Sequence, residues 1–127
     1  MIMNMEEIMA EKLVNTEISE YIEVLSSEAP APGGGAVAAL TAAQGAALIV
    51  MVANLTIGKK KYAEYEELNI GARDEARTYL EQLMKGVDED KEAFEQVSKA
   101  YSMAKQTDSE KAARLTQIGR ASCRERV

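Results

Sequence analysis

The chain has 127 residues, a net charge of −6 and no histidine. Its length suits one domain, and its acidic balance argues against a nucleic-acid partner. The lack of histidine excludes histidine-based catalysis, metal binding and pH switching, and a single cysteine fits a reducing, cytoplasmic location.

A first helix is predicted over residues 18–25. Its apolar residues recur at the steps of three and four that are typical of an amphipathic helix; they are Ile18, Tyr21, Ile22 and Leu25. Thr16 is placed to cap its N-terminus. The residues before it lack the basic and apolar regions of a signal peptide, so we expect none.

Residues 26–35, SSEAPAPGGG, are the clearest break in the chain, because proline and glycine interrupt helices. Residues 36–57 then contain no charge. A membrane span is one interpretation, but alanine predominates and polar residues interrupt the stretch, which favours a helix buried on all sides in a bundle or dimer. Small residues on one face would let another helix approach closely; they are Gly35, Ala39, Ala43 and Ala47.

The second half of the chain also has a helical pattern. Gly58 is expected to end the uncharged helix. Residues 62–105 are amphipathic, which predicts one long helix, or two with a kink at Gly71 or Gly86. The sequence TDSE at 107–110 is a capping box that opens a last helix. Because no strand pattern is present, we predict an all-α, antiparallel helical bundle.

The last ten residues, IGRASCRERV at 118–127, do not continue the helical pattern. They resemble the in-frame translation of a sequencing adapter. We therefore expect that the natural sequence diverges after Gln117, that 118–127 is no part of the fold and that Cys123 has no function. On this interpretation, residues 1–117 are the N-terminal part of a single helical domain.

One carboxylate interrupts the predicted apolar seam of the long helix. The seam follows alternating steps of three and four through Leu80, Leu83, Val87, Asp90, Phe94, Val97 and Tyr101. Because desolvating a lone charge is costly, Asp90 should be paired, protonated or functional. The alternative is that the Asp90 side chain reaches solvent, pairs with a lysine or lies at a kink. The neighbouring acidic residues are expected on a solvated face; they are Asp88, Glu89, Glu92 and Glu95.

Two further features could bind a ligand. The N–H groups and positive dipole at Gly33, Gly34 and Gly35 could hold an anion or a polar ring edge, although a sharp helix connection explains the glycines equally. Lys59, Lys60 and Lys61 could receive an acidic ligand, or they complement the negative end of the preceding helix. The sequence has no phosphate-binding loop, dinucleotide fingerprint or metal-ligand spacing.

Several blocks of the sequence resemble the cyclodeaminase/cyclohydrolase family, which comprises the C-terminal half of formiminotransferase-cyclodeaminase and its stand-alone bacterial relatives. The blocks are APAPGGGAVAAL at 29–40, MVANLT at 51–56, GKKKY at 58–62, VDEDKEAF at 87–94 and KQTDSEKAAR at 105–114. The resemblance runs through residues 16–117 in order and in spacing.

The resemblance implies an all-α bundle that forms a homodimer and binds reduced folate, with or without a polyglutamate tail. It implies conversion of 5-formiminotetrahydrofolate to 5,10-methenyltetrahydrofolate and ammonia or, alternatively, hydrolysis of the methenyl form. The family's catalytic aspartate falls on Asp90, where burial would raise the pKa of the carboxyl group and suit it to proton transfer. The turn at 33–35 would hold the pterin or the reacting group, and the lysines at 59–61 would suit the glutamate tail. Folate is then the substrate, and we expect no metal or organic cofactor and no membrane partner.

The sequence departs from the family in two respects. Ala36 stands where the family often has serine, so any contact that needs that hydroxyl is in doubt. The later helices, with an NPNAxSD-type stretch, are absent, and we expect the 127-residue chain to be poorly soluble or misassociated, and to be inactive. Two alternatives stay open: a non-catalytic helical dimerisation module, which folate binding would exclude, and a membrane-anchored helix, which solubility without detergent would exclude.

Overall fold

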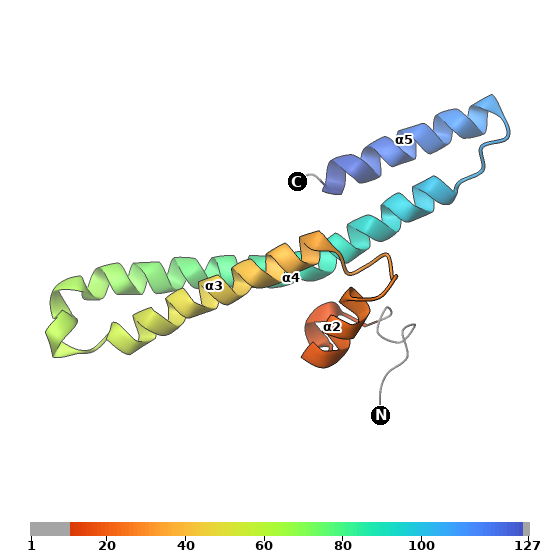
Figure 1. Ribbon diagram of the computed structural model, residues 1–127. Helices are drawn as coiled ribbons and strands as arrows, with labels where there is room; N and C mark the ends of the chain where they lie inside the picture. The colour runs from red at the N-terminus through yellow and green to blue at the C-terminus, as the bar shows by residue number, and fades with distance from the viewer. Residues whose placement is uncertain (1–10, 126–127) are drawn as a thin grey trace. The chain divides into compact units, whose positions relative to one another are not determined.

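The computed structural model describes the backbone of residues 11–125 and the side chains of residues 11–120. Within these residues all regular structure is helical (Figure 1), which confirms the predicted all-α fold. The elements in chain order are the 3-10 helix η1 (Leu13–Asn15), α2 (Ile18–Leu25), α3 (Gly34–Thr56), the 3-10 helix η2 (Lys60–Tyr65), α4 (Glu66–Ser102) and α5 (Asp108–Glu125).

The chain divides into two units. One unit is formed by the residues up to Gly33 together with those from Asp88 onward, and the other is Gly34–Val87. The division falls within α4, so each unit receives part of this helix.

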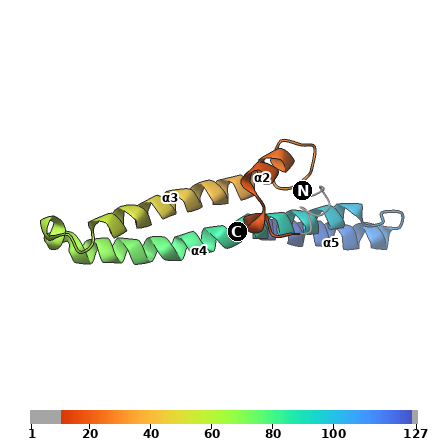
Figure 2. The ribbon, with the colours of Figure 1, turned by 90° about the horizontal axis from the view of Figure 1, so that it is seen from below.

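In the unit Gly34–Val87, α3 and the first part of α4 run antiparallel and side by side (Figures 1 and 2). The buried residues of α3 recur at steps of three, four and seven, which places them on one face; they are Ala36, Ala43, Ala46, Val50 and Ala53. Ala76 and Val87 are buried on α4. A Cβ atom built at Gly86 would lie 3.6 Å from the Cβ atom of Ala39, so small residues let the two helices approach closely.

Helix α3 is not buried on all sides, which corrects the sequence prediction. The unit supplies one neighbouring helix, and large apolar side chains on the other faces of α3 are 50–63% exposed; they are Leu48, Ile49, Met51, Val52 and Leu55. The predicted small-residue face is not the buried one either, since Gly35 and Ala47 are exposed. By length and composition α3 could cross a membrane, but this is weak evidence because core helices of soluble proteins pass the same test.

Helix α3 ends where the sequence predicted. Gly58 has φ of 79°, a left-handed conformation that glycine adopts without steric cost. Its N–H group donates a hydrogen bond to Glu66 Oε1 at 3.0 Å. The turn therefore joins the end of α3 to the first residue of α4.

Helix α4 is a single continuous helix from Glu66 to Ser102. Of the two predicted alternatives, one long helix is therefore confirmed. Gly71 is exposed within it, and Gly86 lies opposite Ala39. Glycine in a helix interior lowers stability without necessarily bending the axis.

In the other unit, α2 buries Tyr21 and Val24. Thr16 does not cap this helix: its N-cap is Glu17, which makes no side-chain cap bond. The Thr16 hydroxyl instead donates to the carbonyl oxygen of Lys12 at 3.4 Å, and Thr16 forms the C-cap of η1. The preceding 3-10 turn thus uses the side chain that was expected to cap α2.

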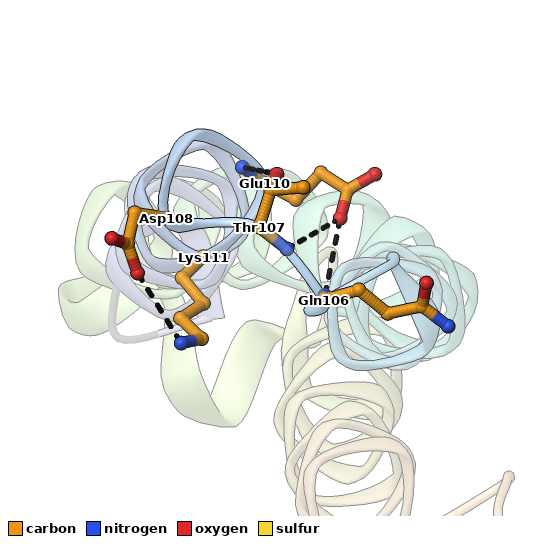
Figure 3. Close-up of polar contacts among 5 residues, drawn as sticks. All are labelled: Gln106, Thr107, Asp108, Glu110 and Lys111. Atoms are coloured by element: carbon orange, nitrogen blue, oxygen red, sulfur yellow. Dashed lines mark hydrogen bonds and ion pairs between the residues drawn. The ribbon is translucent and has the colours of Figure 1, made fainter.

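Helix α5 opens with the predicted capping box (Figure 3). The Glu110 N–H donates to Thr107 Oγ1 at 3.2 Å, and the Thr107 N–H donates to Glu110 Oε2 at 2.9 Å. Further along α5, Arg114 donates from Nε and Nη2 to the carbonyl oxygen of Tyr101, both at 3.2 Å. These bonds fix α5 to the end of α4.

The expected break in the helical pattern at residue 118 is wrong, because α5 continues to Glu125. The segment contains no proline, and arginine, which favours helix, occurs in it three times. The foreign origin of residues 118–127 stays a prediction. The side chain of Cys123 and residues 126–127 lie outside the described part of the chain.

Candidate functional site

Asp90 lies half-buried on α4, in the same unit as α2. Tyr21 of α2 lies in the same unit and is 6% exposed. Burial, and secondly the negative charge of Asp90, raise the pKa of the Tyr21 phenol above its usual value. The carboxylate and the phenol are therefore close enough to interact electrostatically.

The residues beside Asp90 attach α4 to the segment before α2. Asp88 Oδ1 accepts a hydrogen bond of 2.6 Å from the N–H group of Leu13. Lys91 Nζ donates a hydrogen bond of 3.1 Å to the carbonyl oxygen of Glu11. Leu13 and Lys91 are 4% and 7% exposed. One turn of α4 thus carries the candidate catalytic carboxylate and two main-chain anchors.

The roles of the residues on this turn could be predicted from the sequence only in part. Asp88 was expected on a solvated face, but it is half-buried and bonded to the main chain. Lys91 was missed altogether. The burial of Lys91 could have been predicted from its spacing, because Val87, Lys91 and Phe94 follow steps of four and three and share one helix face.

The predicted seam around Asp90 is only partly confirmed. Val87 is buried, and the seam residues that are half-buried are Leu80, Leu83, Asp90, Phe94 and Val97. Tyr101 is 56% exposed, so it does not belong to the seam. Its ring instead packs against Arg114, whose guanidinium carbon lies 5.3 Å from the ring centroid. Glu89 and Glu92 are exposed as expected, whereas Glu95 is half-buried.

The glycine run ends the loop before α3. Gly33 precedes the helix, and Gly34 and Gly35 form its exposed start. A Cβ atom at Gly33 or Gly34 would meet nothing within 4 Å among the described residues. None of the three has a positive φ. For Gly33 and Gly34, neither a positive φ nor close packing within the described chain requires glycine, and glycine is also found where a ligand approaches the backbone closely. Helix N-termini favour such ligands when they carry negative charge or polar acceptors.

The three lysines follow the end of α3. Lys59, Lys60 and Lys61 are all exposed, and Lys61 Nζ lies 5.3 Å from the ring centroid of Tyr62. Three adjacent ammonium groups can attract carboxylates. The lysines, Gly34 and Gly35 belong to the unit Gly34–Val87, whereas Asp90 and Gly33 belong to the other unit.

Comparison with known proteins adds a second line of evidence. The profile of the family described as Formiminotransferase-cyclodeaminase matches residues 17–124. The chain is 45% identical to the methenyltetrahydrofolate cyclohydrolase of Methylorubrum extorquens over 107 residues, which are 84% of this chain and 51% of that relative. It is 29% identical to the formimidoyltransferase-cyclodeaminase of Gallus gallus, covering 81% of this chain and 19% of the relative.

A solved structure is also similar. The formiminotetrahydrofolate cyclodeaminase of Thermotoga maritima matches with a TM-score of 0.68 and 29% identity. The match covers 87% of this chain and 55% of that structure. The chain therefore spans about half the length of this protein and of the Methylorubrum relative.

Proposed function

Because this chain belongs to the formiminotransferase-cyclodeaminase family, we propose that the intact protein transforms the one-carbon unit carried by reduced folate. The family match over residues 17–124 carries the proposal, since it includes Asp90, the glycine run and the lysines. The first candidate reaction is the cyclodeaminase reaction, in which 5-formiminotetrahydrofolate closes to 5,10-methenyltetrahydrofolate and ammonia. The similarity to the Thermotoga cyclodeaminase supports it.

Ring closure needs two proton transfers. Folate N10 attacks the formimino carbon, forms the new C–N bond and loses a proton. The formimino group is an amidine and is protonated at neutral pH, so its exocyclic nitrogen already carries two hydrogens. The bond from the carbon to this nitrogen then breaks, and the nitrogen leaves as ammonia after gaining one more proton. We assign both transfers to the Asp90 carboxylate, which accepts the proton from N10 and returns it to the leaving nitrogen. Its half-buried position on α4 limits competing water while leaving the group accessible.

Two other features are assigned to binding. The start of α3 at Gly34 and Gly35 offers main-chain N–H groups and a positive helix dipole to a polar edge of the substrate. The exposed lysines at 59–61 suit the carboxylates of the glutamate tail, including a polyglutamate tail.

The second candidate is methenyltetrahydrofolate cyclohydrolase activity. The 45% identity with the Methylorubrum enzyme favours it specifically. In this reaction water adds to the methenyl carbon, the bond from that carbon to N5 breaks, and 10-formyltetrahydrofolate forms. A carboxylate can accept one proton of the attacking water and return it to N5, while the second proton is released to solvent as the formyl C=O bond forms and the positive charge of the methenyl form is lost. Asp90 therefore serves either reaction.

One assay separates the two reactions. The protein expressed from its complete gene is given each folate, and the absorbance of the methenyl form is followed against an enzyme-free blank. Gain of absorbance with release of ammonia from the formimino substrate identifies the cyclodeaminase, and accelerated loss from the methenyl substrate identifies the cyclohydrolase. Asp90→Asn should lower kcat by about 10²–10⁴-fold, whereas Glu89→Gln, on the exposed neighbour, should not. A folded protein that turns over neither folate contradicts the proposal.

We also propose that the intact protein is a homodimer. The apolar residues exposed on α3 support this, because a monomer rarely leaves such a surface uncovered. Light scattering coupled to size exclusion should give twice the chain mass. A monomeric mass with full activity would contradict it.

A further inference from the structure

The Tyr21 hydroxyl is a buried polar group without a hydrogen-bond partner in the described part of the chain. Tyr21 as a whole is 6% exposed. Buried side-chain hydroxyls almost always form a hydrogen bond, because an unmade bond in the interior carries the full desolvation penalty. Ring packing alone needs no hydroxyl, so its presence at this position requires an explanation.

The carboxylate of Asp90 is the acceptor that we assign to this hydroxyl. It lies in the same unit, and its charge acts on the Tyr21 phenol. A carboxylate has two oxygen atoms and about four acceptor sites, so it can accept this bond in addition to other interactions. The phenol, whose pKa is raised, stays protonated and keeps its donor at neutral pH.

The local anchoring keeps the two groups near each other. The hydrogen bonds from Leu13 to Asp88 and from Lys91 to Glu11 tie the segment before α2 to the turn of α4 that carries Asp90. Val24, one turn after Tyr21, is buried as well.

We infer that Tyr21 is a positioning residue for Asp90: in the working enzyme its hydroxyl donates a hydrogen bond to the Asp90 carboxylate and fixes its orientation toward the reacting nitrogen. A hydrogen bond between a phenol and a carboxylate is charge-assisted and therefore strongly directional. The inference rests on the proposed function, since it requires that Asp90 transfers a proton.

The variant Tyr21→Phe tests it by removing the hydroxyl and keeping the ring. A hydrogen bond donated to the ionised carboxylate favours its charged form over its protonated form, so the loss of this bond favours the protonated form. The acid limb of the kcat/KM profile should move upward by about one pH unit, and kcat should fall about 10-fold. The thermal midpoint should change little, because the buried aromatic ring and its packing are kept.

The variant leaves the other titratable groups of these segments in place, so a shifted limb reports on the hydroxyl. These groups are Glu11, Lys12, Glu17, Glu20 and Glu23 before and within α2, and Asp88, Glu89, Lys91 and Glu92 on α4. Tyr79→Phe is the matched control. Tyr79 is 52% exposed on α4 and donates to Glu75 Oε1 at 3.0 Å, so removing its hydroxyl should leave the acid limb unchanged.

Each outcome decides the inference. An upward shift in Tyr21→Phe alone supports it. If the acid limb of the kcat/KM profile of Tyr21→Phe lies at the same pH as in the wild type, the inference is overturned. It is also overturned if Tyr21→Phe loses activity together with thermal stability and its acid limb does not shift. A wild-type protein that turns over neither folate overturns the proposed function and the inference together, whereas an active wild type with an unshifted variant overturns the inference alone.

Discussion

Asp88 and Lys91 reach main-chain atoms 75 and 80 residues earlier in the sequence. Both contacts use side chains on the turn that presents Asp90, so the same turn serves structure and the proposed chemistry. Lys91 is 7% exposed and its stem is enclosed, while its ammonium group donates to a carbonyl oxygen. A buried cation is tolerated where its donors are used.

Asp88→Ala is expected to lower the free energy of unfolding by about 1–3 kcal/mol, because it leaves the N–H group of buried Leu13 without its acceptor. Asp88→Asn keeps an acceptor oxygen and should cost less. Glu89→Ala, on an exposed neighbour, is the control and should stay within about 0.5 kcal/mol. Urea unfolding measures all three, and equal values for Asp88→Ala and Glu89→Ala would contradict the anchoring role.

Gly34→Ala tests the binding role of the glycine run. Alanine favours helix over glycine, and its Cβ atom would meet nothing within 4 Å. We therefore expect stability that is unchanged or raised by up to about 1 kcal/mol, together with a KM for folate raised about 10-fold if the substrate approaches this backbone. Gly45→Ala is the matched control, since it also lies on α3 with open space around it. Equal KM values in the two variants would remove Gly34 from the binding site.

At the scale of elements, the N-terminus of α5 depends on a local set of hydrogen bonds (Figure 3). Glu110 Oε2 accepts from the N–H groups of Thr107 and Gln106 at 2.9 and 3.1 Å. These bonds satisfy donors that a helix start leaves open. The bond from the Thr107 main chain is the largest cause that lowers the pKa of Glu110 below 4.5.

The lowered pKa predicts how this helix start responds to pH. A carboxyl group with a lower pKa in the folded state stabilises the fold above its unfolded pKa, and this contribution is lost as pH falls through the folded pKa. Glu110→Gln should therefore be less stable than the wild type near neutral pH, and the difference should shrink below the folded pKa. Thermal unfolding followed by circular dichroism measures it, with exposed Glu81→Gln as control. A difference that does not depend on pH would contradict the role of the charge.

The helices could be predicted where local pattern decides them. The capping box at 107–110 and the stop at Gly58 depend on neighbouring residues alone, and both are confirmed. Thr16 was misassigned because two adjacent elements competed for one hydroxyl. The anchors Asp88 and Lys91 join residues far apart in sequence, which periodicity cannot pair. For the site, Asp90 could be singled out by its spacing, but Tyr21 could not, because its significance depends on an unpartnered hydroxyl in the folded chain.

At the scale of the whole molecule, the most consequential feature is the apolar surface on α3. Leu48, Ile49 and Val52 line an open cavity of about 300 Å³ together with residues of α4. The side chains of these three residues are more than half exposed. Exposed apolar patches of this kind mark surfaces that other chains or segments cover.

We therefore expect the 127-residue chain, expressed alone, to associate with itself. Burying one such side chain contributes about 1.5–3 kcal/mol, so several on one helix are sufficient to drive association. Replacing Leu48 and Val52 with glutamate should reduce it, because charge on both contacting surfaces is costly to desolvate. The matched control is Leu115→Glu on α5, which is 66% exposed but stands apart from this surface in sequence and element.

Size exclusion with light scattering over a dilution series measures the mass, with circular dichroism to verify that each variant keeps its helices. A wild-type chain that stays monomeric throughout the series would show that the apolar surface of α3 does not drive association. Association that persists in the double variant but is lost in Leu115→Glu would place the associating surface on α5.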